Sequence, residues 1–170
     1  GLEDYGKPGN YFARQIDRWT KQYRASETRR IESFENLMLW LPKNIPAGDE
    51  TSIVHGDYRL DNMIFHATEP RVQAVLDWEL STLGDPMADF TYLLMQWTMP
   101  GLANADLKAL NIPSMQEAAA IYCSVTGDTV PDLNWYFSYN LFRLAGITQG
   151  IAGRIRDGTG GLSRQSQEKA

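Results

Sequence analysis

Cysteine and histidine are scarce in this sequence. Its 170 residues include one cysteine, Cys123, and two histidines, His55 and His66. A single thiol excludes an intramolecular disulfide and a cysteine-based zinc site, and two imidazoles leave little for a histidine-rich metal centre. A chain of this length can bury a sizeable core without crosslinks or metals. We therefore expect one globular domain in a reducing, cytoplasmic setting.

Positive charge and long apolar runs are also scarce. Sixteen Lys and Arg residues stand against 21 Asp and Glu residues, which gives a net charge of −5. Nucleic acids and anionic membranes are bound through net or clustered positive charge, so neither is expected as a partner. The longest stretch without charge, residues 90–105, contains Gln96, Pro100 and Gly101. It is shorter than the roughly 20 apolar residues of a membrane span, and no span is expected.

The first part of the chain carries two helical patterns. Apolar residues spaced 4, 3 and 4 apart between Phe12 and Tyr23 predict one helix, and similar spacing over residues 31–41 predicts a second. Ser26 is a break or an N-cap between them. Pro42 ends the second helix, because it lacks a backbone N–H and restricts the residue before it.

The periodicity then changes to that of short strands. Residues 51–55 are β-branched and predict a strand, while residues 62–65 and 72–76 are apolar runs that predict a β-hairpin. Asp85, followed by Pro86, has the pattern of an N-cap with proline at the first helical position.

The rest of the chain is predicted to be helical. One helix runs from Pro86 to about Trp97 and ends before Pro100-Gly101. Ser114 and Glu117 form a capping box for a second helix that ends at Gly127. A third runs from about residue 132 to residue 156. The fold class is therefore mainly α with a small β-hairpin.

The last predicted helix and the end of the chain differ in composition. Gly146, Gly150 and Gly153 lie on adjacent turns and would let another helix approach closely. Residues 158–170 are rich in glycine, serine, glutamine and charge, so we expect a disordered tail there. The predicted domain covers residues 1–157.

The hairpin is flanked by residues suited to chemistry on phosphate groups. Asp57 lies in the loop after the first strand, Asn62 follows it by five residues, and Asp77 follows the second hairpin strand. A paired hairpin brings its two ends together, so Asn62 and Asp77 can offer two oxygens to one Mg²⁺ ion, which prefers oxygen ligands. Asp57 can accept the proton of an attacking hydroxyl.

These residues carry a family resemblance. His55-Gly56-Asp57 with Asn62 matches the H-x-D-x-x-x-x-N loop of the aminoglycoside phosphotransferase and choline-kinase group, which has a protein-kinase-like fold. Leu76-Asp77-Trp78-Glu79 resembles the metal-binding segment of that group, and residues 81–86 with Asp89-Phe90 resemble its next helix start. Residues 4–19 and 58–94 are similar to the kinase-like domains associated with acyl-CoA dehydrogenases.

The resemblance covers most of residues 1–157 and implies a function. It implies an ATP- and Mg²⁺-dependent phosphotransferase that acts on a hydroxyl of a small molecule. Asp57 would be the catalytic base, Asn62 and Asp77 the ligands of Mg²⁺ and the nucleotide phosphates, and His55 an organiser of the loop. Acceptors in the group include aminoglycosides and choline, and the link to acyl-CoA dehydrogenases suggests a hydroxyacyl thioester.

One part of the family pattern is missing from the sequence. No glycine-rich phosphate loop and no lysine on a predicted strand precede His55. We therefore expect the C-terminal lobe of a protein-kinase-like fold only, inactive by itself. Without a small lobe, Mg²⁺–ATP should bind with a dissociation constant on the order of millimolar or weaker. The apolar face left uncovered should favour self-association, for example as a symmetric homodimer.

Two other functions compete with this one. A metal-dependent phosphoesterase is suggested by the two histidines with Asp57 and Asp77, but two-metal esterases usually need more histidine ligands. A non-catalytic kinase-like binding or regulatory module is the second alternative, favoured by the missing lobe and opposed by the intact motif.

Several residues keep two interpretations. Arg59 and Asp61 either contact substrate or are solvated loop residues, and Glu79 is either an acid behind the site or a surface residue. Cys123 fits a core position on a helix face. The aromatic residues between Trp135 and Phe142 are partly core and could also line an acceptor pocket.

Overall fold

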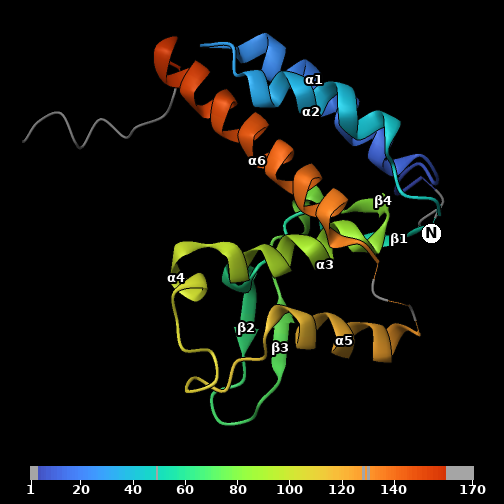
Figure 1. Ribbon diagram of the computed structural model, residues 1–170, viewed down its shortest axis with the longest axis vertical. Helices are drawn as coiled ribbons and strands as arrows, with labels where there is room; N and C mark the ends of the chain where they lie inside the picture. Colours follow the sequence, from blue (N-terminus) through green and yellow to red (C-terminus); the bar gives the residue numbers. More distant parts are fainter. Residues whose placement is uncertain (1–3, 49, 128, 130, 160–170) are drawn as a thin grey trace, which may run out of the picture.

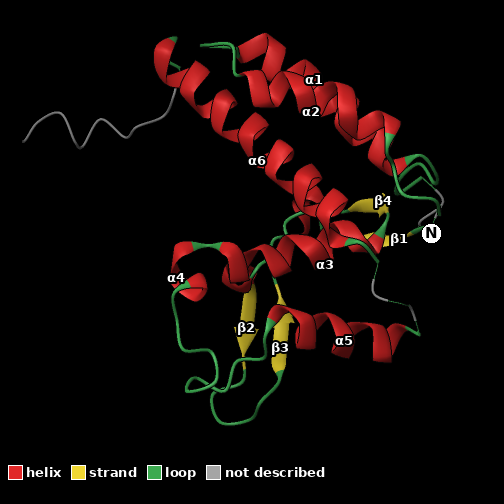
Figure 2. Cartoon of the chain, in the orientation of Figure 1, coloured by secondary structure: helices red, strands yellow, loops and turns green. Residues whose placement is uncertain are grey.

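A computed structural model describes residues 4–48, 50–127, 129 and 131–159 of the chain. Helices dominate, and the strands are confined to two short antiparallel pairs (Figure 2). In chain order the elements are α1 (Tyr11–Ser26), α2 (Glu32–Trp40), β1 (Ser52–Val54), β2 (Met63–Phe65), β3 (Val72–Val75), β4 (Thr82–Gly84), α3 (Pro86–Leu94), α4 (Pro100–Ala103), α5 (Met115–Thr126) and α6 (Leu133–Arg156).

The elements form two groups that meet at α3. Helices α1 and α2 pack along α6 on one side, while the β2–β3 hairpin and α5 lie on the other side of α3 (Figure 1). The loop between β1 and β2 holds two of the predicted site residues, Asp57 and Asn62, and Asp77 follows β3. Side chains of α3 and α6 contact this loop at Gly56.

The first group contains the core that the helical spacing predicts. Phe12, Ile16, Trp19 and Tyr23 of α1 are all buried. Phe34 of α2 stacks on Tyr23 with ring centroids 3.9 Å apart. Phe34 also stacks on Phe142 of α6, with ring centroids 4.5 Å apart. Aromatic side chains of three helices thus form one continuous cluster.

The glycines of α6 allow α1 to approach closely, as predicted. A Cβ atom on Gly153 would lie 2.9 Å from the Cβ atom of Ser26, and one on Gly146 would lie 3.6 Å from the Trp19 ring. The sequence-based alternatives for Ser26 are also decided. It is the last residue of α1 and its hydroxyl donates to the Gln22 carbonyl, so Ser26 marks the break and is not an N-cap.

The strand region confirms the hairpin and adds a second pair. Strands β2 and β3 are antiparallel, with Met63 opposite Val75. Strand β1 pairs with β4, with Ser52 opposite Gly84. Strand β4 was not predicted, and it lies just before the helix start that Asp85 and Pro86 mark as predicted. A three-residue strand has almost no periodicity, and the partner of β1 is far away in sequence.

The capping patterns are confirmed, and one helix end is corrected. The Asp85 carboxylate accepts the Met87 N–H, and Ser114 with Glu117 forms the predicted capping box. Helix α3 ends at Leu94 and not at Trp97, and a 3₁₀ turn follows. Pro100 was expected to stop that helix and instead begins α4, where a missing N–H at the first position costs nothing.

Helix α6 ends at Arg156, as predicted. The backbone N–H groups of Gly158 and Thr159 donate to α6 carbonyls, so two residues of the expected tail close the helix. The remainder of that expected tail, residues 160–170, lies outside the described residues. Within the part of the chain that the structure describes, no helix has the length and apolarity needed to cross a membrane.

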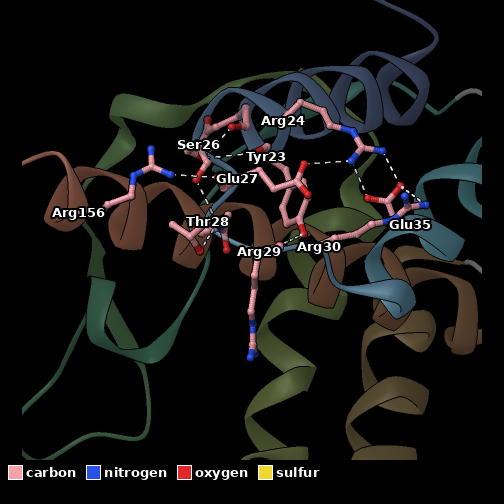
Figure 3. Close-up of polar contacts among 11 residues, drawn as sticks. Tyr23, Arg24, Ser26, Glu27, Thr28, Arg29, Arg30, Glu35 and Arg156 are labelled. Atoms are coloured by element: carbon pink, nitrogen blue, oxygen red, sulfur yellow. Dashed lines mark hydrogen bonds and ion pairs between the residues drawn. The ribbon is translucent and has the colours of Figure 1, made fainter.

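A polar network joins α1, α2 and the end of α6 (Figure 3). Arg24 donates to both carboxylate oxygens of Glu35, at 2.6 and 2.5 Å, and to Glu27 at 3.2 Å. Arg156 of α6 donates to the Glu27 carbonyl at 3.0 Å. The Arg24 guanidinium holds the pKa of Glu35 below its ordinary value.

Candidate active site

His55 connects the loop after β1 to the far end of the hairpin. Its side chain is buried, and Nδ1 accepts the Asp57 N–H at 3.1 Å. Because Nδ1 is the acceptor, Nε2 carries the proton and donates to the Leu76 carbonyl at 2.7 Å. The ring is therefore a neutral bridge between Asp57 and the residue before Asp77. This geometry matches the organising role that the resemblance implies.

Asp89, in the first turn of α3, holds the same loop from its backbone side. Its carboxylate accepts the N–H groups of His55 and Gly56, the latter at 2.9 Å. Burial raises the pKa of Asp89, and the two amides and the Arg143 charge oppose that rise. The sequence pattern places Asp89 only near a helix start, because its hydrogen-bond partners lie more than 30 residues earlier.

Gly56 occupies a position that requires glycine. Its φ is +84°, and a Cβ atom would lie 2.6 Å from the Leu80 carbonyl oxygen. Its own carbonyl accepts a hydrogen bond from the buried Arg143 of α6. The sequence offered no local signal for Arg143, which lies 87 residues away from the loop.

Asp57 and Asn62 are brought into direct contact. The Asn62 side-chain nitrogen donates to the Asp57 carboxylate at 3.0 Å and to the Asp57 carbonyl at 2.9 Å. Tyr92 of α3 lies close to Asp57, and burial, followed by the Asp57 charge, raises the pKa of Tyr92. Asp57 is half-buried, and Asn62 holds its carboxylate at the edge of the loop.

Asp77 is linked to this pair by a backbone hydrogen bond of the residue before it. The Leu76 N–H donates to the Asn62 carbonyl at 2.8 Å, which closes the base of the hairpin. Asp77 is exposed and has a left-handed backbone, with φ of 67°. An aspartate tolerates this conformation better than most residues, and such sparsely populated conformations cluster at functional sites.

The side-chain oxygens at the hairpin ends suit a hard cation. Among the described residues, neither the Asn62 side-chain oxygen nor the Asp77 carboxylate has a hydrogen-bond or ion-pair partner. One neutral and one anionic oxygen fit the small protein share of a Mg²⁺ shell, in which phosphates and water supply the rest. The residues present therefore fit the ion that the resemblance implies.

The remaining polar residues near the loop have structural partners. Arg59 donates to Asp61 at 2.8 Å from Nε, which forms a surface ion pair. His66 Nδ1 accepts the N–H of Glu69 at 3.1 Å within the hairpin turn. Glu79 is exposed and lines a hollow of about 280 Å³ beside α1. With both nitrogens of His55 and one of His66 occupied, the histidines do not form the ligand set of a phosphoesterase.

An apolar hollow adjoins the loop at Tyr58, the residue after Asp57. Its volume is about 470 Å³. Phe90 and Tyr122 in its wall stack at 3.9 Å. The lining residues come from the loop, from α3 and from α5 and the segment before it: Tyr58, Pro86, Phe90, Leu93, Pro113, Ala118, Ile121 and Tyr122. Trp135, Tyr136, Tyr139 and Phe142 are instead buried in the core, and Cys123 is buried as predicted.

Comparison with known proteins identifies the family to which this fold belongs. The family model described as "Phosphotransferase enzyme family" matches residues 1–119, so the chain belongs to that family. It is 44% identical over 165 residues to acyl-CoA dehydrogenase family member 10 of Mus musculus. It is 42% identical over 161 residues to acyl-CoA dehydrogenase family member 11 of Homo sapiens.

Solved structures place the fold. A protein from Ralstonia eutropha assigned to the aminoglycoside phosphotransferases superposes with a TM-score of 0.90 at 55% identity, covering 99% of this chain. An aminoglycoside-3'-phosphotransferase of type VIII superposes with a TM-score of 0.57 at 16% identity, covering 76% of this chain, which shows the fold alone. The chain is mainly α with a small hairpin and has the fold of the C-terminal lobe of a protein-kinase-like protein.

The chain is short beside its relatives. It spans 53% of the Ralstonia protein and 49% of the type VIII enzyme. It spans 15% of the mouse protein and 21% of the human protein.

Proposed function

We propose that these residues form the catalytic lobe of an ATP- and Mg²⁺-dependent phosphotransferase that acts on a hydroxyl group of a small molecule. The observation that carries the proposal is the Asp57 carboxylate, fixed by Asn62 at 3.0 Å and joined through His55 and Leu76 to Asp77. Three separated positions that fit one reaction are stronger support than any of them alone.

Each residue has a distinct task in this reaction. Asp57 accepts the proton of the acceptor hydroxyl while the hydroxyl oxygen attacks the γ-phosphorus, and ADP leaves. Asn62 orients the Asp57 carboxylate through its side-chain nitrogen. Its side-chain oxygen and the Asp77 carboxylate would hold Mg²⁺, which neutralises phosphate oxygens when bound.

The surroundings of Asp57 support an acceptor with an apolar portion. The 470 Å³ hollow that begins at Tyr58 is lined by aliphatic and aromatic side chains. The relatives named above are acyl-CoA dehydrogenase family members. A hydroxyacyl thioester combines a hydroxyl with an acyl chain, and we propose this class as the acceptor.

The activity belongs to a longer protein. Exposed apolar side chains occur on the hairpin and in the segments beside it: Leu60, Ile64, Phe65, Val72, Leu76, Trp78 and Leu80. We propose that a small lobe covers part of this apolar surface, and that these 170 residues alone self-associate and bind Mg²⁺–ATP weakly. A cytoplasmic location is part of the same proposal.

A screen of ATP consumption by the full-length protein against alcohol-bearing metabolites, with hydroxyacyl thioesters among them, tests the function. Asp57→Asn should reduce turnover by about 10²–10⁴-fold, the typical contribution of a general base. The matched control is Asp61→Asn, an equal change of charge on the same loop, which should leave turnover unchanged. Nucleotide binding without phosphate transfer to any acceptor would instead support a non-catalytic kinase-like module.

A further inference from the structure

Arg143 is a buried cation whose polar contact is with the loop of Asp57. It lies in the middle of α6 and is 6% exposed. Among the residues that the structure describes, no carboxylate forms an ion pair with it. Its guanidinium donates to the Gly56 carbonyl and lies over the Tyr92 ring, 4.9 Å from the centroid. It also lies 5.9 Å from the centroid of the Trp19 ring, and its charge acts on the buried Asp89. A buried charge is costly, so its direct hydrogen bond to a loop carbonyl calls for an explanation.

The reason lies in the peptide unit between Gly56 and Asp57. Its carbonyl accepts from Arg143, and its N–H donates to His55 Nδ1 at 3.1 Å. Because a peptide unit is planar, holding both groups fixes its rotation. That rotation sets the direction in which the Asp57 side chain leaves the backbone. Gly56 has φ of +84°, which a glycine adopts without strain, so the loop can present this peptide unit to both partners.

The second contact of Arg143 is with a residue close to Asp57. The guanidinium packs against the ring of Tyr92, whose pKa is raised by burial and by the nearby Asp57 charge. A planar guanidinium can lie on a ring while its edge donates to a carbonyl, a geometry that a lysine ammonium does not reproduce. Arg143 therefore contacts both the Gly56–Asp57 peptide unit and a tyrosine beside Asp57.

We infer that Arg143 is a positioning residue for phosphoryl transfer. From α6 it sets the orientation of Asp57 through the Gly56 carbonyl. The inference rests on the proposed function. It goes beyond the motif, because Arg143 belongs to a helix that contributes no other residue to the loop contacts described above.

The test compares two buried polar residues of α6. Arg143→Met removes the contacts to the loop, while Gln149→Met removes hydrogen bonds to Ser26 and Thr28 at the other end of the helix. In the full-length protein we expect Arg143→Met to lower kcat by about 10²-fold with little change in the KM for ATP, the size of effect that follows from small misplacements. Gln149→Met should lower stability and leave kcat unchanged. Equal kcat values for the wild type and Arg143→Met would overturn the inference, as would equal losses in both variants.

Chemical rescue separates positioning from general destabilisation. Arg143 and Gly56 line the hollow of about 280 Å³ beside α1, so a guanidinium ion can enter the space that a truncated side chain leaves. Guanidinium at a non-denaturing concentration should restore part of the kcat of Arg143→Ala and none of that of Arg143→Lys, whose ammonium occupies the space. Absence of rescue in a folded Arg143→Ala protein would contradict the inference.

One measurement does not depend on turnover. Hydrogen exchange of the Asp57 amide, followed by NMR, should be faster in Arg143→Met than in Gln149→Met, because the peptide unit loses one of its two anchors. Unchanged exchange overturns the inference even if activity falls. Faster exchange in a protein that transfers phosphate to no acceptor would support the positioning contact and reject the proposed function.

Discussion

Arg143 and Arg156 come from the same helix, yet they work in different surroundings. Arg143 is buried beneath the loop of Asp57, where its partners are a carbonyl and two aromatic rings. Arg156 is exposed in the last turn of α6, where it contacts Asp157 and the Glu27 carbonyl. One arginine decides the geometry of a loop, and the other belongs to a solvated network.

The difference extends to the two regions as a whole. In the network of Arg24, Glu27 and Glu35, water can replace each lost contact, so single pairs contribute little to stability. Around Asp57, the contacts from His55, Asp89 and Arg143 are shielded, and a lost partner leaves a group without water to replace it. We therefore expect substitutions near the loop to have large effects and equivalent changes in the network to have small ones.

The largest of these effects is expected at Gly56. Gly56 and Gly127 have the same left-handed backbone conformation, with φ of +84° at both positions, so an alanine at either one is strained. Gly127 has open space around it, so its substitution should cost only the strain, about 1–2 kcal/mol. Gly56→Ala adds a contact with Leu80 at 2.6 Å and should cost about 1–3 kcal/mol more. Urea unfolding of both variants measures the difference in their free energies of unfolding. Equal losses of stability would show that the loop can shift to accommodate the added methyl group.

An intermediate effect is expected from the pH dependence of Asp89. Burial raises its pKa above the ordinary value of 3.8, so the folded state holds the proton more tightly than the unfolded state. Its contribution to stability is complete below that value and is lost as the pH rises through the raised pKa. The stability advantage of the wild type over Asp89→Asn should therefore decline as the pH increases above about 4.

Asp157 supplies the opposite case for the same experiment. The Arg156 guanidinium lowers its pKa, so its contribution is present above the ordinary value and is lost as the pH falls. The difference in unfolding free energy between the wild type and Asp157→Asn should change with pH in the opposite direction. The slope should also be smaller, because solvent screens the Arg156–Asp157 pair. Unfolding free energies measured between pH 3 and 7 check both signs, and slopes of the same sign would contradict the comparison.

The smallest effect is expected at the Arg24–Glu35 pair. A double-mutant cycle with Arg24→Met and Glu35→Gln should give a weak coupling, despite contacts of 2.5 and 2.6 Å. Added salt should weaken it further, because exposed charges are screened. A strong, salt-independent coupling would mean that this network is as rigid as the loop.

The sequence by itself determined the helices and the local parts of the candidate site. Spacing from Phe12 to Tyr23 fixed the buried face of α1, and Asp85 and Ser114 marked helix starts through bonds to residues two or three positions ahead. Asp57 and Asn62 share one loop, so their contact also follows from a short spacing. These features depend on neighbours within about one helical turn or one loop.

Only the tertiary structure decided which distant residues complete the loop. The pairing of β1 with β4 and the contacts of Asp89, Tyr92 and Arg143 join segments 28 to 87 residues apart. Each of these residues alone has the sequence context of an ordinary helix or strand position. Their roles arise because packing α6 against α1 and α3 brings a buried guanidinium under one glycine carbonyl, and no local pattern encodes that packing.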